Sequence, residues 1–125
     1  MVSSPNFPRS YPHNLDKTES IKVKVGKTLR MEFTYFAVTA ANQCPNDYVK
    51  ITDGDGTTLM DRSCGYSTSS SSSWTYFQPP IIMTRTDTVN IFFHTDDSGT
   101  HNGWSMNWTA VTPGFDTIDL RKRLF

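Results

Sequence analysis

Apolar and polar residues alternate with a period of two along most of this chain, and this pattern restricts the fold more than any other feature. The apolar members of each run are expected to share one face: Ile21, Val23 and Val25; Leu29, Met31, Phe33 and Tyr35; Val49 and Ile51; Val89, Ile91 and Phe93; Trp104, Met106, Trp108 and Ala110. Such alternation predicts strands with one buried and one wet face. Clusters of Gly, Pro, Asn and Asp separate the runs, and no amphipathic helix pattern interrupts them. The chain is therefore predicted to be all-β, a sandwich or jelly roll of antiparallel strands.

The last alternating run makes the most specific structural prediction. It places Trp104 and Trp108 in the core between two sheets. Asn107 lies between the apolar positions and should face solvent. Because Asn107-Trp108-Thr109 is an N-glycosylation sequon, Asn107 is a candidate glycan site if the chain is secreted.

Length and charge exclude several classes of function. A chain of 125 residues forms one domain, expected here over residues 1–112, with residues 113–125 as a C-terminal tail or linker. The formal net charge of zero gives no basic patch for nucleic acid or an anionic membrane, and no apolar run is long enough for a membrane span. The chain has three histidines and many serines, but no Gly-rich phosphate loop and little room for a catalytic cleft. We expect no enzymatic activity.

Two cysteines, Cys44 and Cys64, bracket a short β run and a polar turn. The residues alone allow a disulfide between neighbouring β-elements, a pair of buried thiols, or part of a metal site. No CxxC or HxxxH spacing indicates zinc.

The stretch that follows Cys64 differs from the rest of the chain. Residues 67–73 are nearly all serine and predict a mobile loop. Trp74, Tyr76 and Phe77 follow directly; re-entry into the core is favoured over an exposed binding patch. We expect the basic residues 121–123 of the tail to be solvated and favour this over a proteolytic processing site.

Four motifs, in order and at consistent spacing, resemble a known family. They are Ser4-Pro5-Asn6-Phe7-Pro8 with Tyr11-Pro12 and Asn14; Cys44-x-x-Asp47-Tyr48-Val49-x-Ile51-x-x-Gly54; Cys64-Gly65; and Phe93-x-Thr95-Asp96-x-Ser98 followed by Gly103-Trp104-x-Met106-x-Trp108. Together they resemble a CUB domain, an extracellular module, and the single pair of cysteines is most like the module of complement-initiating proteases. The resemblance implies a jelly-roll sandwich of two antiparallel sheets, a Cys44–Cys64 disulfide and a secreted or extracellular location.

The resemblance also implies a calcium site at one end of the sandwich. The matching acids are Asp47 and Asp96, with oxygens near Ser98 completing the shell and Tyr11 supporting the site from behind. The family places a glutamate where this chain has Thr39. Because hard cations are held by several oxygens that usually include carboxylates, losing one acid should leave at most a weak Ca²⁺ site.

The sequence is compatible with three functions. The leading one is a non-catalytic module of a larger secreted or membrane-anchored protein that binds a partner protein, with Asp47, Asp96 and Asp97 facing a lysine or arginine of that partner. The alternative is a carbohydrate-binding module that uses Trp74 and Tyr76. The third is a fragment that positions the catalytic domain of an enzyme.

Overall fold

The computed structural model describes residues 1–67 and 75–112. These ranges contain nine strands: β1 (Val2–Ser3), β2 (Asp16–Lys22), β3 (Thr28–Val38), β4 (Tyr48–Asp53), β5 (Thr58–Ser63), β6 (Gly65–Tyr66), β7 (Ile82–Met83), β8 (Thr88–His94) and β9 (Gly103–Val111). None of the described secondary structure is a helix able to cross a membrane. The serine loop beyond Ser67, Trp74 and the predicted tail lie outside the described residues.

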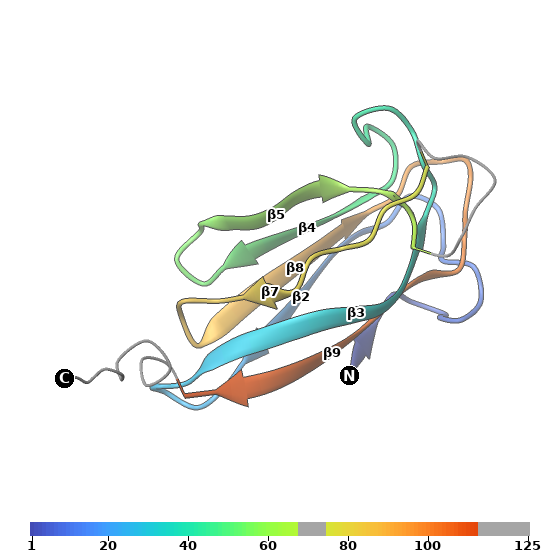
Figure 1. Ribbon diagram of the computed structural model, residues 1–125. Coiled ribbons are helices and arrows are strands. Elements are labelled where there is room, and N and C mark those ends of the chain that lie inside the picture. The colour runs from blue at the N-terminus through green and yellow to red at the C-terminus, as the bar shows by residue number, and fades with distance from the viewer. Residues whose placement is uncertain (68–74, 113–125) are drawn as a thin grey trace.

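The strands form two sheets that face each other (Figure 1). One sheet has the order β1-β9-β3-β6, with β7 also pairing with β3, and the other has the order β2-β8-β4-β5. Every pairing between these strands is antiparallel. The all-β prediction of two antiparallel sheets is therefore confirmed.

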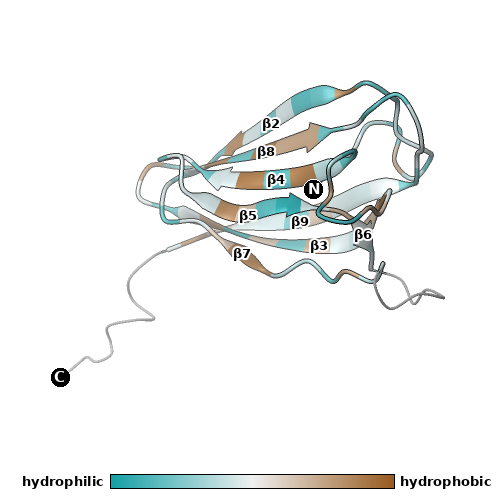
Figure 2. Cartoon of the chain, turned by 90° about the horizontal axis from the view of Figure 1, so that it is seen from above, coloured by the Kyte–Doolittle hydropathy of each residue, from teal (hydrophilic) through white to brown (hydrophobic). Residues whose placement is uncertain are grey.

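The core lies between the sheets, on the apolar faces that the alternation predicted. Strand β4 shows this directly, because Val49 and Ile51 are fully buried while their neighbours Tyr48, Lys50 and Thr52 are partly exposed. Hydrophobic and more polar residues alternate along this strand in Figure 2. The same holds for Val89, Ile91 and Phe93 of β8, which are at most 2% exposed. These faces supply most of the buried apolar area that stabilises the fold.

Strand β3 departs from strict alternation at one point. Its register with β9 shifts between Phe33 and Tyr35, so that Thr34 forms a β-bulge. A bulge moves the following residues to the other face. Phe36 is therefore fully buried, whereas Tyr35, which was predicted to lie on the core face, is only partly buried.

The first predicted strand was placed too late in the chain. Strand β2 covers Asp16–Lys22, not residues 21–25, and Val25 is 80% exposed. The partner strand explains the error: β8 begins at Thr88, which pairs with Lys22, so residues after Lys22 have no strand beside them.

The prediction for the two tryptophans of β9 is right for one and wrong for the other. Trp104 is 2% exposed, but Trp108 is 36% exposed. Trp108 pairs with buried Met31, so the predicted face is correct. However, β1 covers β9 only as far as Met106, and Trp108 lies at the uncovered edge of the sheet. Asn107 is exposed, as predicted.

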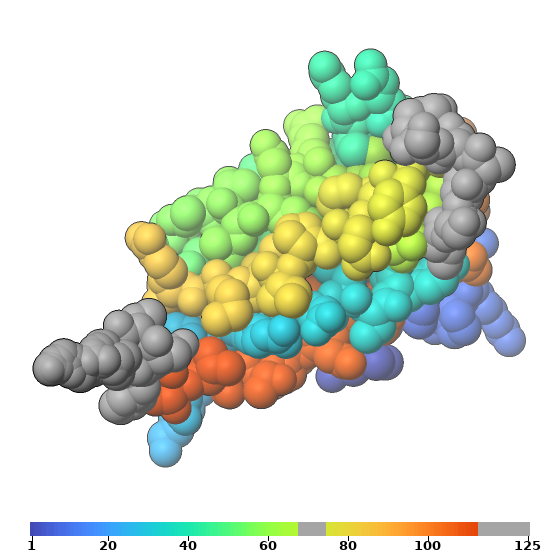
Figure 3. All heavy atoms as spheres, in the orientation of Figure 1, coloured from blue at the N-terminus to red at the C-terminus, as the bar shows by residue number. Residues whose placement is uncertain are grey.

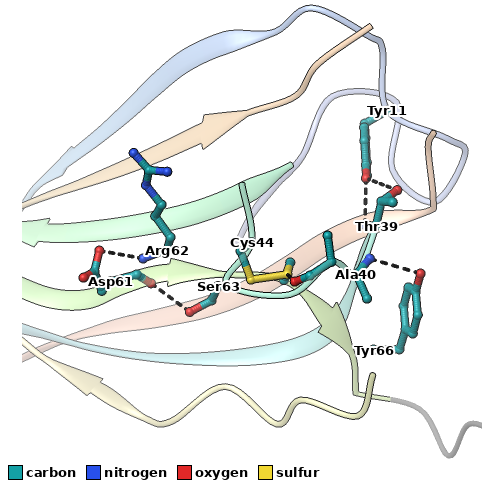
Figure 4. Close-up of a disulfide and its surroundings, with 10 residues drawn as sticks. Tyr11, Thr39, Ala40, Cys44, Asp61, Arg62, Ser63 and Tyr66 are labelled. Carbon is teal, nitrogen blue, oxygen red and sulfur yellow. Dashed lines mark hydrogen bonds between the residues drawn. A yellow bond between two sulfur atoms is a disulfide. The ribbon is translucent and has the colours of Figure 1, made fainter. Parts of the chain in front are cut away.

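The two cysteines form a disulfide, with their Cα atoms 5.6 Å apart. It joins the loop before β4 to the residue between β5 and β6 (Figure 4). The expected disulfide is thus confirmed.

Candidate functional site

Loops from four parts of the chain meet at one end of the sandwich. They carry Tyr11, which follows β1, Thr39 at the end of β3, Asp47 before β4, and Asp96 after β8. The register brings the two acids together, since Tyr48 pairs with His94. The segment between β3 and β4 stands out from the body of the molecule at this end (Figure 3).

Tyr11 ties three of these elements together. Its ring is 1% exposed and packs edge-on against Phe93, with the ring centroids 5.0 Å apart. Its hydroxyl donates to Asp47 Oδ2 at 2.7 Å and accepts the Thr39 N–H at 3.0 Å. The same hydroxyl lies 3.1 Å from Thr39 Oγ1 (Figure 4). Burial raises the pKa of Tyr11, so it remains a donor to Asp47.

Asp47 is a carboxylate with no exposed surface. Besides Tyr11, it accepts the backbone N–H of Asp96 on Oδ1 at 2.9 Å. It takes part in none of the ion pairs of the described residues. Burial raises the pKa of Asp47; its two hydrogen bonds oppose this effect, and the charge of Asp96 adds to it. The site therefore holds a buried negative charge that no cation of the described residues compensates.

Asp96 lies at the more exposed side of the site. Its carboxylate accepts the Ser98 N–H at 3.1 Å and the Asn46 side-chain amide at 2.8 Å. The hydrogen bond from Ser98 lowers the pKa of Asp96, and Asn46 adds to this. Asp97 is exposed in the bend that follows.

Thr39 occupies the position at which the family resemblance places a glutamate. Its hydroxyl contacts Tyr11, and its methyl carbon lies 3.3 Å from where a Cβ on Gly99 would stand. The described residues contain no cluster of three or more His, Cys, Asp or Glu side chains that could hold a metal. The donor set is two carboxylates with neutral oxygens around them.

The structure thus brings together Tyr11, Thr39, Asp47 and Asp96, and it places Ser98 against Asp96 through its N–H. Sequence reasoning missed Asn46, the amide partner of Asp96. It also missed the Tyr66 hydroxyl, which lies 3.1 Å from His101 Nε2 and accepts the N–H of Ala40. These side chains lie on loops or on a two-residue strand, where no periodicity marks them.

The aromatic residues after the serine run divide into two kinds. Phe77 is partly buried and packs on Phe36, with the ring centroids 5.4 Å apart, so re-entry into the core is confirmed there. Tyr76 is 51% exposed, and re-entry is wrong for that residue.

Comparisons with known proteins agree with this architecture. The family model for the CUB domain matches residues 1–108. Rat (Rattus norvegicus) cubilin is 29% identical over 111 residues, which are 89% of this chain and 3% of cubilin. The mouse (Mus musculus) complement C1r-B subcomponent is 33% identical over 122 residues, 95% of this chain and 16% of that protein. The chain therefore spans only a small part of these relatives.

A solved structure, the CUB2 domain of MASP-1 bound to Ca²⁺, superposes with a TM-score of 0.70 at 25% identity, covering 86% of this chain and 88% of that one. The family match covers nearly the whole chain, and the sandwich, the disulfide and the motif residues all fit it. This chain belongs to the CUB domain family, as a non-catalytic extracellular module of a kind typical of protein–protein interaction.

Proposed function

We propose that the loop end of this CUB domain binds one calcium ion weakly and presents its acids to a basic side chain of a partner protein. One observation carries the proposal: Asp47 is a fully buried carboxylate without a cationic partner in the part of the chain that the structure describes, and Asp96 lies beside it. Burying an uncompensated charge is costly, and a bound cation offsets that cost.

The residues present fit a weak calcium site. Calcium prefers carboxylate, carbonyl and hydroxyl oxygens, and its affinity rises with the number of anionic ligands. Asp47 and Asp96 would supply the charge, and oxygens near Thr39 and Ser98 the neutral ligands. Each carboxylate oxygen that accepts one hydrogen bond keeps a second lone pair for a ligand bond. A calcium ion would neutralise the two acids and hold their loops together. The fold's similarity to a calcium-bound CUB domain supports this assignment.

The partner chemistry follows from the same charges. Asp96 and Asp97 lie at the accessible side of the site, whereas Asp47 lies beneath them. A lysine or arginine of a partner can pair with these outer acids, with calcium fixing the loops that carry them. Binding of this kind depends on calcium even where the metal does not touch the partner.

A calcium titration of the intact domain tests the proposal. We expect a dissociation constant in the millimolar range, followed through the amide resonances of Asp96 and Ser98. Asp47→Asn should abolish the response, and Thr39→Glu, which restores the third acid, should tighten binding at least about tenfold. Micromolar affinity in the unchanged domain, or no effect of Thr39→Glu, would contradict this assignment of ligands.

We also propose that Asn107 carries a glycan when the domain is secreted. Asn107 is exposed on the outer face of the β1-β9-β3-β6 sheet, where it pairs with exposed Glu32. A glycan there would leave the loop end uncovered. Intact mass before and after enzymatic deglycosylation of the secreted domain, with Asn107→Gln as control, tests this.

Carbohydrate binding is the second candidate, and exposed Tyr76 supports it. Tyr76 lines a pocket beside the disulfide together with Asn42 and Gln43. Aromatic rings next to amides suit sugar faces and hydroxyls. Loss of binding to an oligosaccharide array in Tyr76→Ala, with calcium binding retained, would favour this candidate.

A further inference from the structure

The outer face of the β2-β8-β4-β5 sheet carries a continuous row of charged and aromatic side chains. Asp16, His94 and Tyr48 stand opposite one another on β2, β8 and β4, and Arg62 of β5 completes the row. His94 Nδ1 lies 2.6 Å from Asp16 Oδ1, and its ring centroid lies 5.1 Å from that of Tyr48. The Arg62 guanidinium carbon stands 4.6 Å from the centre of the Tyr48 ring.

A second row lies one step further along the same strands. Lys50 of β4 pairs with Phe92 of β8, and the Phe92 ring centroid is 6.1 Å from that of Tyr48. Side chains alternate between the two faces of a strand. Because Val49, Ile51, Ile91 and Phe93 fill the core, the residues between them lie on the outer face. Lys50 and Phe92 are each partly exposed there.

Two of the cations on this face, Lys50 and Arg62, stand outside its ion pairs. Asp16 contacts His94, and Lys22 pairs with Asp87. The exposed Asp61, next to Arg62 on β5, accepts the Arg62 backbone N–H. Neither Lys50 nor Arg62 joins an ion pair in the described parts of the chain. Two cations thus flank the rings of Tyr48 and Phe92.

The geometry also prepares this face for binding. Arg62 extends from β5 across the sheet (Figure 4), and its contact with the Tyr48 ring restricts the guanidinium before any partner arrives. A side chain that is already restricted loses less entropy on binding. Tyrosine and arginine are also the residue types that most often dominate binding energy at protein interfaces.

We propose that this face binds an acidic segment of a partner protein. Carboxylates of the segment pair with Arg62 and Lys50, while its apolar groups pack on the rings of Tyr48 and Phe92. Charge complementarity selects the partner, because Lys50 and Arg62 are cations without an ion-pair partner among the described residues, whereas the neighbouring loop end is negative. The two surfaces take partner groups of opposite sign, so this binding does not depend on calcium.

A defined probe tests the proposal: an N-acetylated ten-residue peptide of alternating glutamate and tyrosine, with a lysine–tyrosine peptide of the same length as its control. We expect the acidic peptide to bind saturably at low salt and to shift the amide resonances of Tyr48, Lys50, Arg62 and Phe92. Arg62→Ala and Lys50→Ala should each weaken binding by about fivefold to tenfold. Arg62→Lys should retain part of the affinity, because it keeps the charge but loses the planar fork.

Two matched variants separate this proposal from the others. Arg30→Ala removes an exposed arginine from the opposite sheet and should leave peptide binding unchanged. Asp96→Asn removes an acid of the loop end, and it should not weaken peptide binding either. The proposal is overturned if no binding occurs, if Arg30→Ala weakens binding as much as Arg62→Ala, or if the lysine peptide binds the same face. Preference of this face for a heparin oligosaccharide over the acidic peptide would also overturn it.

Discussion

Two buried aspartates stand at opposite ends of β4, Asp47 directly before the strand and Asp53 as its last residue. Both are at most 1% exposed, and neither joins an ion pair in the described residues. Asp53 accepts the backbone N–H groups of Gly54, Arg85 and Thr86 and the Thr86 hydroxyl, at 2.6 to 3.3 Å. From the described residues, Asp47 accepts two hydrogen bonds, and a second carboxylate lies next to it.

This difference in hydrogen bonding sets opposite pKa shifts. Burial opposes the charge of Asp53, but the bonds from Thr86, Arg85 and Gly54 together outweigh burial and hold its pKa below the usual range. Burial wins at Asp47, whose pKa is raised. Hydrogen bonds therefore stabilise the charged form of Asp53. The charge of Asp47 is incompletely compensated, which suits a cation-binding site.

The largest expected effect is at Asp53. Asp53→Ala would remove the acceptor of the partly buried N–H groups of Arg85 and Thr86 in the turn before β8 and would leave a cavity at a fully buried position. The free energy of unfolding should fall by about 3 to 5 kcal/mol in urea denaturation. Asp47→Ala should cost less, about 1 to 2 kcal/mol, because it also removes an uncompensated buried charge. An equal loss of unfolding free energy in both variants would contradict the contrast between Asp47 and Asp53.

The disulfide should come next in size. It braces only the Asp47 end, through the loop before β4. Replacing both Cys44 and Cys64 with alanine should lower the free energy of unfolding by about 2 to 4 kcal/mol. Calcium affinity should weaken as well, while the pKa of Asp53 should stay unchanged. A shift at Asp53 would mean that the two ends of β4 are coupled.

Acid should affect the two carboxylates with opposite sign. The stabilisation from Asp53 is present above the ordinary aspartate pKa and is lost as the pH falls through its lowered folded pKa. Asp47 with its raised pKa binds a proton more tightly when folded, so its contribution declines as the pH rises from about 3.9 through the folded pKa. The free energy of unfolding, measured by denaturation between pH 2 and 6, should rise less steeply with pH in Asp53→Asn than in the unchanged domain. In Asp47→Asn it should rise more steeply. The same change in both variants would refute the assignment.

Calcium should have the smallest effect on stability. At ~2 mM calcium and a dissociation constant of ~1 mM, the stabilisation is about 0.7 kcal/mol. The melting temperature should therefore rise by only a few degrees. Asp47→Asn should lose this rise, whereas Asp55→Asn, an exposed change in the turn next to Asp53, should keep it.

Sequence predicted the sheets and the motif residues of the loop end, because period-two alternation and motif spacing are local signals. It failed where the outcome depends on a neighbouring strand. The bulge at Thr34 turned Tyr35 away from the core in favour of Phe36, and the short β1 left Trp108 at an uncovered edge. No alternation within β3 or β9 carries that information.

The site shows the same limit. The motifs predicted Asp47, Asp96 and Tyr11 as one group, and the structure brings them together, but the contrast between Asp47 and Asp53 was not predicted. Both are acids at the ends of one strand, and what distinguishes them is contact with distant residues, Thr86 for one and Tyr11 for the other. Long-range hydrogen bonds of this kind leave no spacing in the chain.

Carboxylate NMR on domain labelled with ¹³C-aspartate tests the central contrast most directly. We expect the pKa of Asp47 to lie above the ordinary aspartate value and that of Asp53 below it. Added calcium at 10 mM should lower the Asp47 midpoint and leave that of Asp53 where it was, since protons and metal compete only at the loop end. A pKa of Asp47 at or below that of Asp53 would contradict this contrast. So would a calcium effect on both titration midpoints, or on neither of them.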